Sequence, residues 1–313
     1  MINRRIIRTK VLQTIFAHYL SKNNSLTMIE KELEFNYKRF YDLYFYIFRL
    51  LIDINDYARR KQEKAKKRYM PSAEDLNPNA KFVNNKLIAQ LRENIFIQNH
   101  LQETKLSWIN NPELIKNLYN QLALTEQFEN YMQSDDNSYK SDKEIIIYCL
   151  NTIIYNNEDF FNILEEQSMF WNDNVEYVVE MVLKTLKNFS IGYDRTAKLM
   201  PKFKNEIDED FSRQLLRKSV LNKEKYKKLV EENTLNWDYD RLAYIDLLII
   251  QLAITELITF PEIPTKVTFN EYIELSKIFS TPKSANFING ILDKIVQKLQ
   301  ETGEINKIGR GLK

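Results

Sequence analysis

The sequence predicts an all-α fold, and three observations lead to this prediction. Only five of the 313 residues are glycine, and four of these lie at or beyond position 290. Sheets need glycine in their tight turns, so this scarcity favours helices joined by short polar links. The seven prolines stand mostly between stretches with apolar residues at helical spacing, where they begin or end helices. Hydrophobic residues make up 44% of the chain, which is enough for a sizeable core.

The N-terminal segment predicts an amphipathic helix over residues 3–20, with Asn3 as its N-cap. Apolar residues recur there every three or four positions and form one stripe: Ile7, Val11, Leu12, Ile15, Phe16, Tyr19 and Leu20. Arg4 and Arg8 stand one turn apart outside this stripe, and Arg5 and Lys10 flank them. Cations at a helix N-terminus oppose the helix dipole. We therefore expect these charges to serve a partner.

The central segments predict further helices. The first two are expected at 27–35 and 37–57, and the basic run 59–68 continues the second of them. Others are expected at 84–103, 112–132, 141–155 and 157–169, because polar breaks rich in Asn, Ser and Asp separate these stretches.

The last third predicts helices at 175–188, 206–220 and 223–233. Residues 241–258 are apolar nearly all round, which is typical of the buried centre of a bundle. After an extended link at Pro261 and Pro264, the sequence from Thr268 to Glu271 predicts a capping box that starts the next helix. A final helix is expected to begin at Thr281 and Pro282.

Charge is distributed unevenly, although the formal net charge is only +2. Residues 58–69 hold seven basic side chains and one acid, whereas residues 126–180 hold thirteen acids and two lysines. Such asymmetry predicts a basic face for an anionic partner and a separate acidic face.

Enzymatic chemistry finds no support in the residue pattern. A single cysteine, Cys149, excludes an intrachain disulfide and a cysteine-based zinc cluster, and the two histidines have no metal-ligand spacing. No P-loop or nucleophile elbow occurs. The sequence therefore predicts a protein that is not an enzyme and needs no cofactor. We see no signal-peptide pattern, and the most hydrophobic segment is too short to span a membrane, so we expect the protein in the cytoplasm.

Five segments together resemble the NusB family. The N-terminal segment RRIIRTKVLQTIFAHY (4–19) is similar to that family's arginine-rich first helix. Four C-terminal motifs follow in the family's order and spacing: LIIQLAITEL (248–257), IPTKV (263–267), NEYIELSK (270–277) and FINGILD (287–293). The resemblance implies N-terminal core helices at 1–35, a helical insert at 36–170, the rest of the core at 171–300 and a flexible tail at 301–313.

The resemblance also implies a fold and a function. The fold is a NusB-like helical bundle of two subdomains, here with a large helical insertion. The activity is transcription antitermination: the protein pairs with NusE, a small-subunit ribosomal protein, on single-stranded boxA-type RNA. The pair acts on the RNA polymerase elongation complex, notably during transcription of ribosomal RNA.

Candidate site residues combine the residue pattern with this resemblance. Arg4, Arg5, Arg8 and Lys10 are expected to contact RNA phosphates, because the planar guanidinium group suits phosphate oxygens. Gln13 is expected either at a base edge or in an internal polar contact, and Phe287 either against RNA or in the core. Three residues are expected at the NusE contact: Phe16, Tyr19 and Asp246. The first two suit the core as well, and Asp246 is equally suited to an internal pair with lysine or arginine, since a buried carboxylate needs a partner.

Two other functions stay open at this point. One is a helical protein-binding scaffold with weak or no RNA binding, and the other is an RNA-modifying enzyme with its site in the insert. The basic run 59–68 is either a solvated face or an additional contact with RNA.

Overall fold

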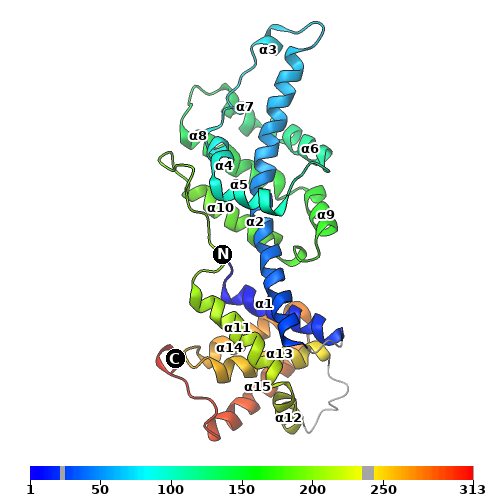
Figure 1. Ribbon diagram of the computed structural model, residues 1–313, viewed down its shortest axis with the longest axis vertical. Coiled ribbons are helices and arrows are strands. Elements are labelled where there is room, and N and C mark those ends of the chain that lie inside the picture. Colours follow the sequence, from blue (N-terminus) through cyan, green and yellow to red (C-terminus); the bar gives the residue numbers. More distant parts are fainter. Residues whose placement is uncertain (22–24, 235–242, 313) are drawn as a thin grey trace. The chain divides into compact units, whose positions relative to one another are not determined.

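The computed structural model describes residues 1–21, 25–234 and 243–312, and this part of the chain is built of helices (Figure 1). Extended pairing in these ranges is limited to an isolated parallel bridge between Ile2 and Phe203. The predicted all-α fold is confirmed.

The chain divides into two compact units. The first combines Met1–Tyr37 with Lys202–Lys313, and the second is Lys38–Pro201. Helix α2 (Leu26–Lys66) contributes to both, since residues 26–37 belong to the first unit and residues 38–66 to the second. The insert expected at 36–170 stays a prediction.

The first unit is a bundle around one central helix. Its helices are α1 (Arg4–Leu20), α11 (Glu206–Leu221), α12 (Lys223–Asn233), α13 (Tyr244–Thr259), α14 (Thr265–Phe279) and α15 (Ser284–Glu301). Helix α13 contacts all the others, and its residues from Leu248 to Leu257 are buried without interruption. Within residues 243–258 this confirms the central helix that the apolar pattern predicted; Arg241 and Leu242 lie outside the described residues.

Residues after α15 also contact the bundle. Ile305 is buried, and Lys307 Nζ donates hydrogen bonds to the carbonyl oxygens of Leu257 and Phe260 at 3.0 and 3.1 Å. A short 3-10 turn follows at Gly309–Leu312. These contacts attach Lys307, within the segment 301–313 that was expected to be a flexible tail, to the end of α13.

The second unit surrounds the aromatic part of α2. Its other helices are α3 (Ala73–Leu76), α4 (Lys86–Glu93), α5 (Ile95–Thr104), α6 (Pro112–Ala123), α7 (Glu126–Gln133), α8 (Tyr139–Tyr148), α9 (Glu158–Gln167) and α10 (Val175–Asn188). A π-helical turn at Cys149–Ile154 extends α8, and a 3-10 turn at Asn172–Asn174 precedes α10. Nearly every residue of α2 between Phe40 and Ile54 is buried, on all sides of the helix.

Several predicted helix boundaries were wrong. Helix α2 is continuous where two helices were expected at 27–35 and 37–57. The polar residue at the expected break, Asn36, is buried inside the helix and donates to Thr14 Oγ1 at 2.9 Å. Conversely, side-chain caps at Asn94 and Thr125 divide the stretches 84–103 and 112–132 into two helices each. A contact with another helix decides the first case and local side-chain caps decide the second, and a helical pattern reveals neither.

The predicted capping box at Thr268 was also wrong. Helix α14 begins three residues earlier, at Thr265, directly after Pro264. The amide groups of Val267 and Thr268 donate to the Pro264 carbonyl oxygen, so Thr268 lies within the first turns. Its hydroxyl group and the Glu271 carboxylate are consequently available for contacts with other helices.

In the ranges that the structure describes, no helix combines the length and apolarity required to cross a membrane. The same ranges contain no cluster of three or more histidine, cysteine, aspartate or glutamate side chains that could hold a metal ion.

Candidate functional site

The predicted arginine cluster lies at the start of α1, where Asn3 caps the helix as expected. The Asn3 side chain accepts a hydrogen bond from the Ile6 amide at 3.0 Å. The first turn of α1 contains no acid that would favour the helix dipole. Arg4 and Arg8 instead pair with acids on other helices.

Arg8 forms a buried ion pair with Glu256 of α13. Its Nε and Nη2 atoms donate to the two carboxylate oxygens at 2.7 and 2.8 Å, a fork-shaped arrangement. The Arg8 and Glu256 side chains are only 4% and 0% exposed. Arg8 Nη1 also donates to Glu271 Oε2 at 3.2 Å. The guanidinium group of Arg8 thus ties α1 to α13 and α14.

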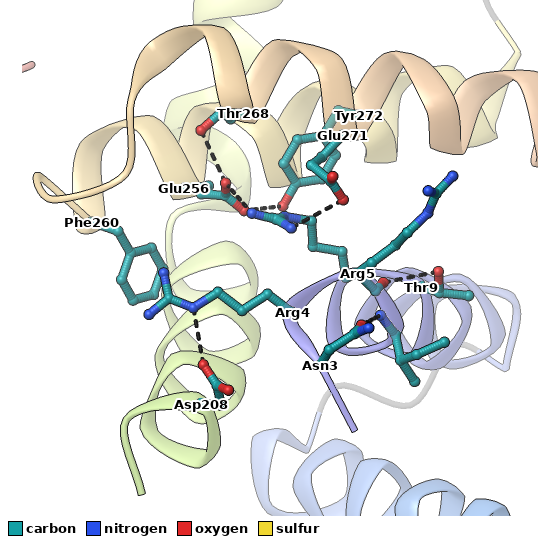
Figure 2. Close-up of polar contacts among 12 residues, drawn as sticks. Asn3, Arg4, Arg5, Thr9, Asp208, Glu256, Phe260, Thr268, Glu271 and Tyr272 are labelled. Atoms are coloured by element: carbon teal, nitrogen blue, oxygen red, sulfur yellow. Dashed lines mark hydrogen bonds and ion pairs between the residues drawn. The ribbon is translucent and has the colours of Figure 1, made fainter. Parts of the chain in front are cut away.

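Helix α14 completes the hydrogen bonding of Glu256. Thr268 Oγ1 donates to Glu256 Oε1 at 2.9 Å, and the Tyr272 hydroxyl donates to Oε2 at 3.1 Å (Figure 2). A carboxylate in an apolar helix is costly unless such donors surround it. Four donors around Glu256 meet this need.

The pKa values in this network reflect its burial. Desolvation alone would lower the pKa of Arg8, but the hydrogen bonds and negative charge of Glu256 outweigh it and raise that pKa above its ordinary value. Burial, together with the nearby Glu256 charge, raises the pKa of Tyr272 well above its usual range. Arg8 therefore stays charged and Tyr272 stays protonated, so the network does not titrate through these two groups near neutral pH.

Arg4 and Arg5 differ from Arg8 in exposure. Arg4 Nε donates to Asp208 Oδ1 at 3.1 Å, and its guanidinium carbon lies 4.9 Å from the centre of the Phe211 ring. Arg5 is exposed, and within the described residues its guanidinium group forms no ion pair. Figure 2 shows the Arg5 side chain directed away from Glu256 and Asp208.

An open groove of about 540 Å³ brings the three arginines together. We call it the α1 groove, and it is lined by Arg4, Arg5, Arg8, Glu262, Ile263, Pro264, Val267 and Glu271. The Val267 side chain on its wall is 42% exposed. A cation beside exposed apolar surface can hold a phosphate and the flat face of an unpaired base.

The other predicted residues of α1 lie apart from this groove. Lys10 is buried, and Gln13 is partly exposed. Phe16 and Tyr19 are also partly exposed, and both rings lie beside the Tyr244 ring at the start of α13, with centroid separations of 6.1 and 6.2 Å. Lys223 Nζ lies 3.9 Å from the Tyr19 ring centre, a close cation–π contact.

Asp246 lies in the first turn of α13, where its charge favours the helix dipole. The residue is 5% exposed, and its Oδ2 atom accepts a hydrogen bond from Ser284 Oγ at 2.7 Å. The alternative of a lysine or arginine partner finds no support in the described residues, which provide a serine instead. Within those residues Asp246 Oδ1 is buried without a hydrogen bond. Phe287, one turn after Ser284 on α15, is partly exposed.

The structure also shows site residues that sequence reasoning missed: Asp208, Glu256, Glu271 and Tyr272. One signal was present, because Glu256 is an acid in an almost wholly apolar helix and needs a buried cation. Its partner, Arg8, is 248 residues away in sequence, and only the folded chain identifies it.

Comparisons with known proteins agree on one family. The NusB family model matches residues 173–297. The transcription antitermination protein NusB of Salinibacter ruber is 37% identical over 139 residues, which cover 42% of this chain and 87% of that protein. The NusB proteins of Natranaerobius thermophilus and Alkaliphilus oremlandii are 45% and 34% identical over 80 and 124 residues. These matches cover 26% and 38% of this chain, and 58% and 90% of the respective relatives. No solved structure matches the chain.

Proposed function

The chain belongs to the NusB family, and from this premise we propose that it is a transcription antitermination factor that binds single-stranded boxA-type RNA together with the ribosomal protein NusE. In this proposal it works by binding alone, without a cofactor. The pair acts on the RNA polymerase elongation complex and supports transcription of ribosomal RNA.

The α1 groove is the observation that supports RNA contact. Arg5 is exposed there beside Val267 and Pro264, and the Arg8–Glu256 pair fixes the helix that carries it. In the proposal Arg5 and the exposed edge of Arg4 contact phosphates, whereas Arg8 holds in place the helix that carries these two arginines. Gln13 and Phe287, which are partly exposed, are proposed further along the RNA path, whereas Lys10 is buried and is not assigned to the RNA contact.

The start of α13 supports a protein contact. Phe16 and Tyr19 form a partly exposed aromatic surface with Tyr244, and Asp246 provides a buried oxygen that lacks a donor within the described residues. A hydrogen-bond donor from NusE would satisfy this oxygen and remove the cost of leaving it unpaired. We therefore assign Phe16, Tyr19 and Asp246 to the NusE contact.

Binding of labelled boxA-type RNA, with and without NusE from the same source, tests the proposal. We expect NusE and RNA to strengthen each other's binding to the full chain, because the coupling between two ligands is reciprocal. Phe16→Ala should weaken NusE binding and leave the RNA affinity of the free chain unchanged. Arg5→Gln should weaken RNA binding by the free chain and leave its affinity for NusE unchanged.

Lys294→Gln is the matched control, since Lys294 is exposed on α15 and does not line the α1 groove. Absence of RNA binding by the folded wild-type chain, both alone and with NusE, would overturn the proposal. A triple change of Arg4, Arg5 and Arg8 is unsuitable here, because loss of Arg8 leaves Glu256 buried without its cation.

A further inference from the structure

The second unit contains its own basic groove, lined by the C-terminal part of α2 and the start of α6. We call it the α2 groove. Its volume is about 600 Å³, and six basic side chains line it against two acids: Arg49, Arg60, Lys61, Lys64, Arg68 and Lys116 against Asp53 and Glu113. It therefore has a strong excess of positive charge, unlike the chain as a whole.

Part of this charge is neutralised within the unit. Arg49 pairs with Asp53 at 2.7 Å, and Lys116 pairs with Glu113 at 2.9 Å. The ion pairs of the described residues include neither Arg60 nor Lys64, and both side chains are exposed. Two cations in the groove are thus available to an anion.

These cations form a regular row. Arg60 and Lys64 are spaced four residues apart on α2, which places them on one face about 6 Å apart along the helix, and Arg68 follows in the turn directly after the end of α2. Arg68, at the end of the row, also reaches Asp75, with Nη1 3.4 Å from the carboxylate. A row of this kind suits a chain of successive negative charges better than a single anion.

Apolar surface lies beside the row. The Ile109 side chain is 78% exposed, and the partly exposed Tyr57 ring lies 5.4 Å from the Tyr119 ring. Lys61 Nζ lies 5.0 Å from the centre of the same Tyr119 ring. Cations interleaved with aromatic and aliphatic side chains are typical of surfaces that bind the backbone and the base faces of single-stranded nucleic acid.

The walls of the α2 groove are fixed by buried contacts. Trp108 is fully buried, stacks on Tyr46 with 3.9 Å between ring centres, and donates to the Tyr46 carbonyl oxygen at 3.0 Å. On α2, Asn55 donates to the Phe82 carbonyl oxygen at 2.7 Å. A preformed groove avoids part of the ordering cost of binding.

We propose that the α2 groove is a second RNA-binding site, which holds a single-stranded segment by its phosphates without reading its sequence. The choice of RNA as the polyanion rests on the proposed function. An acidic protein segment would gain charge pairing from the cations but would leave the exposed Ile109 and the partly exposed Tyr57 ring uncovered, whereas nucleobases would cover them.

Binding of fluorescein-labelled oligouridine to the full chain, measured at several salt concentrations, tests the proposal. We compare Arg60→Gln/Lys64→Gln with Lys66→Gln/Lys67→Gln, which removes the same charge from exposed residues of the same segment outside the groove. Loss of two phosphate contacts should flatten the log–log salt slope by about 1.4. If the wild-type and variant lines converge at 1 M salt, the variant should bind about 25-fold more weakly than the wild-type chain at 0.1 M salt. The control pair should retain most of the affinity and slope.

Equal effects of the two pairs would overturn the proposal, because they would show attraction to general positive charge. Tighter binding of polyglutamate than of oligouridine would overturn it in favour of an acidic protein. Photocrosslinking of a 4-thiouridine-substituted strand gives an independent readout, since crosslinks at Tyr57 or Ile109 are expected and crosslinks confined to α1 would contradict the site.

The same experiment separates this proposal from the proposed function. Short boxA-type RNA should bind the Arg60→Gln/Lys64→Gln variant as tightly as it binds the wild-type chain, because the proposed site for this RNA is the α1 groove. If that RNA fails to bind either protein while oligouridine binding depends on Arg60 and Lys64, the proposed function fails and the α2 groove stands. The reverse result removes the α2 groove alone.

Discussion

Two basic runs of this chain look alike in sequence and differ in the structure. The run at the start of α1 places Arg8 in a buried pair with Glu256, Arg4 beside Asp208 and Lys10 in the interior. The run at the end of α2 leaves its side chains exposed, and Arg60 and Lys64 stand outside the ion pairs of the described residues. Positive charge thus stabilises the fold in the first run and faces solvent in the second.

The difference shows that the number of basic residues does not measure the charge available to a partner. An acid on a distant helix, Glu256, converts the central arginine of the first run into a structural residue. Nearby acids of α2 pair with other cations, as Asp53 does with Arg49 at 2.7 Å and Asp56 does with Arg92 at 2.6 Å. The predictions below test this contrast, beginning with the largest effect.

Arg8→Ala should destabilise the first unit most. It leaves Glu256 buried with two hydroxyl donors and no cation, a change that costs about 3–5 kcal/mol. Denaturant unfolding monitored by circular dichroism measures the loss. A loss under about 1 kcal/mol would mean that the pair is not buried as described.

Restoring neutrality should recover much of that loss. The double variant Arg8→Met/Glu256→Leu removes both charges, and apolar replacements of a buried pair are often close to neutral. Recovery is expected to be incomplete, because Thr268 and Tyr272 lose their acceptor. A double variant no more stable than Arg8→Ala would contradict this explanation.

Arg4→Ala should have an intermediate effect of about 1 kcal/mol, because its pair with Asp208 is partly solvated and it also stacks on Phe211. The same unfolding measurement checks it. The order of Arg8 above Arg4 follows from burial, so a reversed order would break the contrast within the first run.

Acidic pH should weaken the first unit through His18, near the end of α1. Burial lowers the pKa of this imidazole below its ordinary 6.5, and Lys223 contributes in the same direction while Glu32 opposes it. The unfolded chain then binds the proton more tightly than the folded chain. The free energy of unfolding therefore does not depend on His18 ionisation well above pH 6.5, and it decreases as the pH drops below 6.5. His18→Gln should reduce this dependence, as thermal unfolding between pH 7 and pH 5 would reveal.

The second run should contribute least to stability. Arg60→Ala/Lys64→Ala changes two exposed side chains outside the observed ion pairs, so the free energy of unfolding should move by about 0.5 kcal/mol or less. A loss comparable with that of Arg8→Ala would show that both runs are structural.

Sequence reasoning went further for the fold than for the site. Helical spacing and scarce glycine predicted the all-α fold, and the apolar pattern at 241–258 predicted the central helix α13. The capping-box pattern at Thr268 failed because a hydroxyl and a carboxylate three residues apart can equally serve a neighbouring helix, here through Glu256 and Arg8. Arg8 and Glu256 meet only after folding, and the α2 groove needs α6 beside α2, so local patterns could not reveal either arrangement.

The salt dependence of boxA-type RNA binding by Arg5→Gln tests the central claim most directly, namely that the arginine left exposed at the start of α1 contacts RNA. With unchanged thermal stability, Arg5→Gln should flatten the log–log salt slope by about 0.7, the value for one single-strand phosphate contact. Lys294→Gln should leave the slope unchanged. A folded Arg5→Gln variant with the wild-type affinity and slope would contradict the claim.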